Sequence, residues 1–377
     1  MGRRIALLGT WDTKANELGH FERLAKEAGL EIIQIDLSTN VPATNDKSTH
    51  LKRVRDDVTP LLQDIEQKCD AFVAIGGGTG AEVSLQLFQH LGPMTAKFLL
   101  APFTFDPRVA TSGMMVTCLF SPVDIKGSGP LLNQAYQQLV GQLTSHAVAE
   151  TELPKSPHIA LSALGVTEPA ITNTLNALEP AHSNISVFHA NGFGGVSLAR
   201  LIDDQTIDFL IDLTPHELTR HLIGGAHAPL GARLSAMSAC PSISLPGGLN
   251  FLGLGPLKEI DPVLRKRQLF EHSANFTHVV LDEAEMEQVA HRWAELLNAS
   301  SHRKQVVLPM RGFSTHDAPG GVLENPNLRE ICRDIVTSNC HHFQIYELDA
   351  HINDAETATI VADLFNDWHS TNSTRLK

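Results

Sequence analysis

The stretch Ala71–Gly80, AFVAIGGGTG, decides the fold that we expect for this chain. Its first half, Ala71–Ile75, is a short apolar run, which is typical of a strand covered on both faces of a parallel sheet. The second half is rich in glycine, and the residues from Ala81 onward predict a helix. Glycines let the backbone take positive φ angles and let a ligand approach the main chain closely.

A strand, a glycine turn and a helix N-terminus together form an anion site, most often for phosphate. The alternative is a tight turn without a ligand, for which one glycine would suffice, whereas this turn has four. We therefore expect a phosphate-bearing ligand at this turn. The predicted contact residues are Gly76, Gly77, Gly78, Thr79 and Gly80.

Outward from this stretch, strand-like and helix-like segments alternate, and glycine or polar clusters follow the strands. The alternation predicts an α/β fold of two Rossmann-like, doubly wound parallel-sheet subdomains. A length of 377 residues also fits two domains better than one. The polar segment ETELPKSP, residues 150–157, is the best linker candidate. We therefore expect a nucleotide-binding subdomain over residues 1–155 and a second subdomain over residues 156–377.

The composition restricts the partners and the compartment. A formal net charge of −13 argues against non-specific binding of nucleic acid or anionic membranes, which needs a basic surface. No apolar run approaches the ~20 residues that span a bilayer, and the N-terminus lacks the apolar region of a signal peptide. The five cysteines are scattered without a CxxC pair, which indicates reduced thiols. We expect a cytoplasmic protein.

The segment GTWDTK, Gly9–Lys14, follows the first predicted strand. Its threonines could bond phosphate or ribose oxygens, Lys14 could neutralise phosphate charge, and Asp12 could hold Mg²⁺ or cap the next helix. Plain helix capping is the alternative, but the glycine turn in the same half favours a nucleotide. The predicted contact residues are Gly9, Thr10, Asp12, Thr13 and Lys14.

Neither motif has the spacing of a common nucleotide fingerprint. The Walker A pattern GxxxxGK[ST] is absent, and no GxGxxG follows the first strand. Asp36 does lie where a ribose-binding acid would lie in a dinucleotide fold, so NAD stays open as an alternative.

The second half contains another strand followed by a glycine loop, FHANGFGG, Phe188–Gly195. It predicts a second anion cradle, with His189 beside it either as a proton-transfer group or as an ordinary histidine at a strand end. The predicted contact residues are Gly192, Gly194 and Gly195.

Two later strand-exit loops carry polar side chains that could form an acid/base site. Arg311 and Asp317 lie in one loop, and His351 lies in the other. With His189 they are the candidate catalytic residues of an enzyme that acts on a small carboxylate or phosphorylated metabolite in the interdomain cleft. Loop capping and salt bridges are the alternative. The spacing HExxxH at His216 is not the HExxH of a zinc site, so we predict no metal ligands there.

These motifs, in this order, resemble the family of the ATP-binding inhibitory domain of the plant tobamovirus resistance protein and its uncharacterised bacterial and fungal relatives. The similar segments are LLGTWDTK, AIGGGTGAEVS, ALGVTEPAI, VFHANGFGGVSLARLI, DLTPHELTRHLIGG, LPGGLNF, LPMRGFSTHDAPGG and ELDAHIND. The resemblance implies two Rossmann-like subdomains, a homodimer, and ATP with Mg²⁺ bound in the first subdomain.

Two loops depart from the family pattern. APFTFDPRVATSG, residues 101–113, replaces a loop rich in serine and threonine, and Phe193 replaces a threonine in the second glycine loop. Three hypotheses follow: an ATP-binding protein, the enzyme described above, and a regulatory module that inhibits a partner. The first two are compatible where ATP is a substrate.

Overall fold

The computed structural model describes residues 2–38, 47–102, 104–146, 157–178, 182, 184–225, 228–340 and 342–373. The chain divides into two compact units, Met1–Glu152 and Leu153–Lys377, and each is described by itself. The boundary that we expected after residue 155 falls in residues 147–156, outside the described residues.

The first unit contains a five-stranded parallel sheet with the strand order β2-β1-β3-β4-β5. Its strands are β1 (Arg4–Gly9), β2 (Glu31–Asp36), β3 (Ala71–Ile75), β4 (Lys97–Pro102) and β5 (Val116–Ser121). All five residues of β3 are buried, since β3 pairs with a strand on each side and has helices over both faces. Its bounds are those expected from the apolar run.

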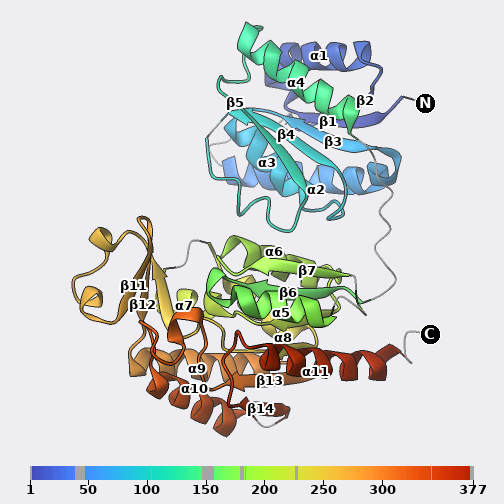
Figure 1. Ribbon diagram of the computed structural model, residues 1–377. Coiled ribbons are helices and arrows are strands. Elements are labelled where there is room, and N and C mark those ends of the chain that lie inside the picture. The colour runs from blue at the N-terminus through green and yellow to red at the C-terminus, as the bar shows by residue number, and fades with distance from the viewer. Residues whose placement is uncertain are drawn as a thin grey trace. The chain divides into compact units, whose positions relative to one another are not determined.

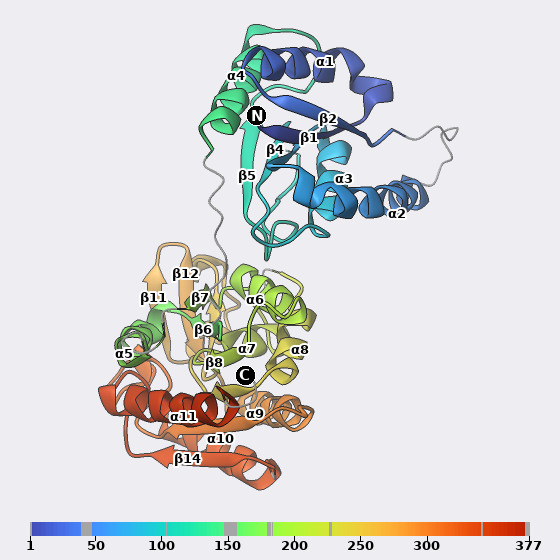
Figure 2. The same ribbon diagram turned by 90° about the vertical axis from the view of Figure 1, so that its right-hand side faces the viewer.

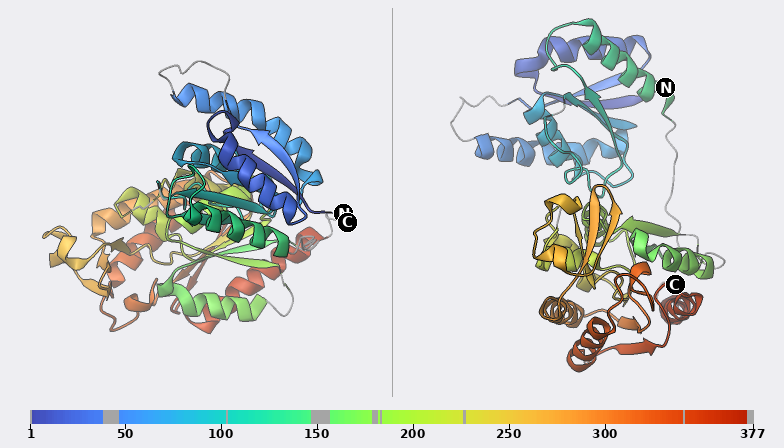
Figure 3. Two further views of the ribbon diagram at one scale, coloured as in Figure 1. Left: turned by 90° about the horizontal axis from the view of Figure 1, so that it is seen from above. Right: turned by 60° about the vertical axis from the view of Figure 1, so that its left-hand side comes forward.

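Two helices cover each face of this sheet (Figures 1 and 3). The helices are α1 (Trp11–Glu27), α2 (Lys47–Ile65), α3 (Gly78–Phe88) and α4 (Pro130–Ser145), and the short 3₁₀ turn η1 (Glu66–Lys68) follows α2. Leu18 of α1 and Leu139 of α4 belong to the core on one face, whereas Leu62 of α2 and Leu85 of α3 belong to the core on the other.

The second unit is built around a six-stranded parallel sheet with the order β14-β13-β9-β8-β6-β7. Its strands are β6 (Ile159–Ala163), β7 (Ile185–His189), β8 (Phe209–Asp212), β9 (Ser242–Ser244), β13 (Lys304–Pro309) and β14 (Gln344–Leu348). Helices again cover both faces, so the predicted doubly wound α/β class is confirmed for both units.

In the second unit α5 (Glu168–Leu178) and α11 (Ala355–Ser373) pack side by side on one face (Figure 2). The other face carries α6 (Phe193–Asp203), α8 (Gly231–Ala239), α9 (Glu283–Asn298) and α10 (Pro326–Asn339). A short helix, α7 (His216–Leu222), follows β8. An antiparallel sheet, which the sequence did not predict, consists of β10 (Phe251–Leu254), β11 (Leu269–Ser273) and β12 (Phe276–Val280).

Numbered within each unit, the two sheets share the strand order 2-1-3-4-5, and the second adds a sixth strand at the end. In the first unit β2 lies on one side of β1 and the later strands β3, β4 and β5 lie on the other, so the switch point of the sheet is between β1 and β3. In the second unit the switch point is between β6 and β8. Open α/β sheets bind ligands beyond the carboxyl ends of the two strands at such a switch point. The loops after β1 and β3 are GTWDTK and the glycine turn.

Candidate functional site

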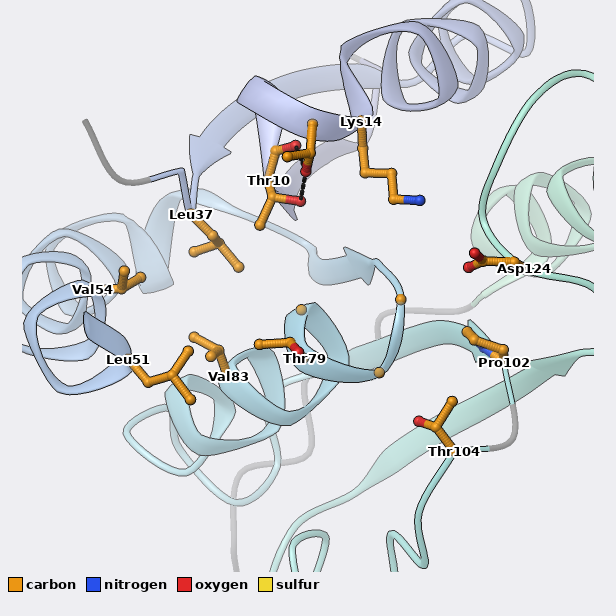
Figure 4. A pocket seen from close by; sticks show the side chains of 14 residues that line it. Thr10, Lys14, Leu37, Leu51, Val54, Thr79, Val83, Pro102, Thr104 and Asp124 are labelled. Atoms are coloured by element: carbon orange, nitrogen blue, oxygen red, sulfur yellow. Dashed lines mark hydrogen bonds between the residues drawn. The ribbon is translucent and has the colours of Figure 1, made fainter. Parts of the chain in front are cut away.

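A cavity of about 610 Å³ opens at the switch point of the first unit. The structure thus brings together the two sequence motifs, because the loops after β1 and β3 both contribute to its wall (Figure 4). Of the predicted contact residues, Thr10, Thr13, Lys14, Gly77, Gly78, Thr79 and Gly80 line it.

None of the glycines of this turn has a positive φ angle, and two of them, Gly76 and Gly78, serve close packing. Our expectation about backbone angles was therefore wrong at this turn. A Cβ atom added at Gly76 would lie 3.2 Å from the Cα atom of Gly80, and one added at Gly78 would lie 2.7 Å from Thr104 Oγ1. Larger residues would force the end of β3 away from α3 and from the loop after β4.

Helix α3 begins at Gly78, earlier than the expected start at Ala81. Its first intrahelical bond runs from the Ala81 N–H to the Gly77 carbonyl at 2.9 Å, so the N–H groups of Gly78, Thr79 and Gly80 belong to the first turn. No side chain in the described ranges caps this end. Uncapped N–H groups and the helix dipole attract an anion, and these residues line the cavity.

The two ends of the cavity differ in chemistry (Figure 4). Leu37, Leu51, Val54 and Val83 form an apolar end, between β2 and the helices α2 and α3. Lys14 and Asp124 lie at the other end, with the glycine turn between the two ends. Lys14 departs from helical backbone angles, with φ −126° and ψ 17°, and its Nζ donates to the carbonyl of Ile125.

Three predicted contact residues do not line the cavity. Gly9 and Gly76 are buried in the packing of the strand ends, where a Cβ on Gly9 would meet the side chain of Leu18. Asp12 is exposed, and its backbone N–H donates to Ser38 Oγ. Asp36 accepts the N–H of Trp11 at 3.2 Å, so this carboxylate caps α1.

The sequence reading missed Asp124, the acidic residue that does line the cavity. The available signal was its place a few residues after the end of β5, at the same sheet edge as the two motifs. Thr104, Leu37, Leu51 and Val54 were also missed, because they come from loops or a helix without a motif, and Val83 was missed although it follows the glycine turn within α3.

In the second unit, the predicted anion cradle holds a carboxylate of the protein. The N–H of Gly192 donates to Glu217 Oε1 at 2.6 Å, and a Cβ on Gly195 would collide with the same carboxylate. The N–H of Gly194 donates to Asn191 Oδ1. The expectation of a ligand anion is therefore corrected at this loop, since Glu217 fills it.

Glu217 belongs to a buried charge network. Arg233 Nε donates to Glu217 Oε2 at 2.9 Å, and Arg233 Nη2 donates to Asp212 Oδ1 at 2.7 Å. All three side chains are at most 1% exposed. The network ties β8 to α7 and α8, so its role is structural.

The candidate catalytic residues do not form one constellation. His189 ends β7, one edge strand, whereas Arg311 and Asp317 follow β13, and His351 follows β14 at the opposite edge. Four strand spacings separate β7 from β13, or about 19 Å at 4.8 Å a strand. His189 therefore lies too far away to exchange a proton with the other three.

Asp317 and His351 hold loops together. Asp317 is buried, accepts the N–H of Phe313 at 2.9 Å and pairs with Arg329 Nη1 at 2.6 Å. His351 Nε2 bonds the carbonyl of Ser314 at 3.0 Å, and burial lowers its pKa. The alternative of loop capping fits both residues.

Arg311 and His189 are exposed. Among the described residues, no partner within ion-pair distance faces the Arg311 guanidinium. A catalytic role for either stays a prediction.

Two buried hydroxyls link the loops at the switch point of the second unit. Thr167, after β6, and Thr214, after β8, are fully buried, and their hydroxyls bond each other at 2.7 Å. The loops after the corresponding strands of the first unit, β1 and β3, instead line the cavity.

Within the described ranges, no helix has the length and apolar character needed to cross a bilayer, and no cluster of three acidic, histidine or cysteine side chains is arranged to hold a metal ion. None of the five cysteines forms a disulfide.

Several known proteins are similar to this chain over most of its length. A UPF0261 protein of Clostridium tetani is 26% identical over 96% of this chain and 98% of its own length. One of Mesorhizobium japonicum is 25% identical over 96% of this chain and 98% of its own length. The ToMV resistance protein Tm-1(GCR237) of Solanum lycopersicum is 27% identical over 80% of this chain, but only 42% of the tomato protein is covered.

The similarity to the bacterial UPF0261 proteins and to the tomato resistance protein agrees with the resemblance seen in the motifs. The model of the uncharacterised protein family (UPF0261) C-terminal domain matches residues 156–369. Since this match covers more than half of the 377 residues, the chain belongs to the UPF0261 family.

Proposed function

We propose that the first unit binds a nucleotide, ATP, in the cavity at its switch point. The observation that carries the proposal is the uncapped N-terminus of α3, whose first turn, Gly78–Gly80, lines a cavity together with Lys14. A helix N-terminus attracts phosphate through its free N–H groups and its dipole, and the lysine adds a full positive charge.

The rest of the cavity suits the nucleoside. A volume of about 610 Å³ lies within the usual range for small-molecule pockets. Its apolar end, Leu37, Leu51, Val54 and Val83, favours a flat, weakly polar group such as a base, because burying such a group removes apolar surface from water. Phosphates at the glycine turn and a base at the apolar end give the ligand one orientation.

The enzyme hypothesis for the second unit is not carried forward. It needed His189 beside Arg311, Asp317 and His351, and the strand order separates His189 from the other three residues. No observation on the described residues favours the regulatory hypothesis, and it is not carried forward either.

We infer a cytoplasmic location from the free thiols, which persist in a reducing compartment. We also propose that the protein is a homodimer, as the family resemblance implies. Light scattering at micromolar concentration is expected to give a mass near twice 41.0 kDa, and a mass near 41.0 kDa would contradict it.

Isothermal titration calorimetry with ATP and MgCl₂ tests the proposed function. Lys14→Met is the informative variant, because it removes the charge and keeps most of the length of the side chain. Loss of a charge-assisted contact is expected to weaken binding about 10- to 100-fold. Lys26→Met, on the exposed side of α1, is the matched control. No binding by the parent protein, or equal affinities of parent and Lys14→Met, would overturn the proposal.

A further inference from the structure

We propose that a second cavity of the first unit binds a small metabolite through an oxyanion group, a phosphate or a carboxylate, with Arg23 and Lys126 as the contacting side chains. The cavity has a volume of about 620 Å³ and lies between α1 and the loop that joins β5 to α4. Helix α1 contributes Glu17, His20 and Arg23 to its wall, and the loop contributes Lys126. None of its lining residues lines the proposed nucleotide cavity, so this site does not depend on the proposed function.

The guanidinium of Arg23 is held in place by a neutral group. Its Nη2 donates to Nδ1 of His20, and Nε2 of His20 lies 2.9 Å from Oδ1 of Asn133 on α4. Because an amide oxygen only accepts, the imidazole carries its proton on Nε2 and leaves Nδ1 to accept from Arg23. The neighbouring Glu22 pairs with Lys26 instead, and no carboxylate of the described residues lies within ion-pair distance of Arg23. This orients a cation toward a cavity without offsetting its charge.

Lys126 brings a second positive charge to the wall. Its Nζ lies 3.7 Å from Oε1 of Glu17, a buried carboxylate that also accepts the N–H of Gly127 at 2.7 Å. Burial opposes ionisation of Glu17, but the bond from Gly127 outweighs it and lowers the pKa. Two cations and one carboxylate leave the wall with one net positive charge, in a chain whose formal net charge is −13. A local positive field attracts small anions.

A buried hydroxyl without a partner lies beside this wall. Tyr136 of α4 is fully buried, and its ring centroid lies 5.8 Å from that of His20. Burial and the charge of Glu17 both raise its pKa, so the phenol keeps its proton. Its Oη has no hydrogen-bond partner among the described residues. Buried hydroxyls normally bond to protein, water or ligand, so this one points independently to a bound polar group next to Glu17 and His20.

The side chains of the cavity favour an oxyanion. A guanidinium presents parallel N–H groups that match two oxygens of a phosphate or a carboxylate, and an ammonium adds a point charge. Ser128 also lines the cavity and offers a hydroxyl donor. The volume lies within the usual range for small-molecule pockets and is larger than a bare phosphate requires. The oxyanion is therefore one end of a larger molecule.

Nuclear magnetic resonance titration of the full, nitrogen-15-labelled chain tests this inference. Sodium phosphate and sodium acetate are added separately at constant ionic strength, and the stronger response identifies the preferred group. Saturable shifts are expected at the backbone amides of Gly127 and Ser128 and at Nε of Arg23. Arg23→Met is expected to weaken this binding about tenfold or more, since it removes a charge-assisted contact. Arg53→Met, at an exposed position of α2 outside the cavity, is the matched control and is expected to bind like the parent.

Gly19→Met fills the cavity without removing a charge. Gly19 lies within α1 and lines the cavity, and a Cβ added there would have no atom within 4 Å. The variant is expected to lose the saturable shifts while its melting temperature stays at or above that of the parent, because glycine weakens a helix. Shifts that do not saturate with either anion, or equal affinities of parent and Arg23→Met, would overturn the site. Parent-like binding by Gly19→Met would contradict its location. Amides of Gly78–Gly80 report separately on the nucleotide cavity.

Discussion

Replacing Gly80 with alanine is expected to stabilise the first unit and to weaken nucleotide binding at the same time. Gly80 is the third residue of α3, and a Cβ added there would have no atom within 4 Å. Because Gly80 lines the cavity, the added methyl group would occupy space in front of the free N–H groups. The two expected effects have opposite signs, which separates a ligand-binding role from a folding role.

The magnitude of the stabilisation follows from the backbone. Alanine is more favourable than glycine within a helix by about 0.5–1 kcal/mol, since glycine loses more conformational freedom on folding. For a unit of this size, 1 kcal/mol corresponds to a rise of about 2–4 °C in the melting temperature. The magnitude of the binding loss follows from one blocked charge-assisted hydrogen bond, about 1.5–3 kcal/mol, or about 10- to 100-fold in affinity.

Gly141→Ala is the matched control. Gly141 lies within α4, a Cβ there would also have no atom within 4 Å, and the residue does not line the cavity. Calorimetric melting is expected to show a similar gain for both variants, and titration with Mg-ATP is expected to show a loss for Gly80→Ala only. Parent-like affinity of Gly80→Ala would refute the placement of phosphate at this helix end.

Two further predictions concern the second unit. Arg233→Met leaves the buried Asp212 and Glu217 without a cation and is expected to lower the free energy of unfolding by about 3–5 kcal/mol in urea titration. Arg292→Met, which breaks an exposed pair with Glu295, is the control with an expected effect below about 1 kcal/mol, and equal effects would contradict the structural role of the network. Burial lowers the pKa of His216 to about 3, so the folded state disfavours its charged form. The stability that this neutral ring contributes is present above the unfolded pKa of about 6.5 and is lost as the pH falls toward 3, by about 2 kcal/mol at pH 5. A loss between pH 6.5 and 5 that is the same in His216→Phe as in the parent would show that other groups cause it.

Local patterns in the sequence were sufficient to predict the fold class and the two loops that line the first-unit cavity. The apolar run Ala71–Ile75 predicted β3 with its observed bounds, because a fully buried strand needs apolar residues on both faces. The glycine turn and GTWDTK predicted one site because parallel strands end at the same edge of their sheet. Both are short-range signals. The alternation of strands and helices along the whole chain then predicts the doubly wound class.

The tertiary structure alone decided which loops meet. Strand order is set by packing between residues far apart in the chain, so the sequence could not show that β7 and β14 lie at opposite edges and separate His189 from His351. It could not show that Glu217 fills the second glycine loop, 25 residues away in sequence. Nor could it choose Asp124 over Asp12, because both follow a strand and only the folded chain directs one carboxylate toward the glycine turn.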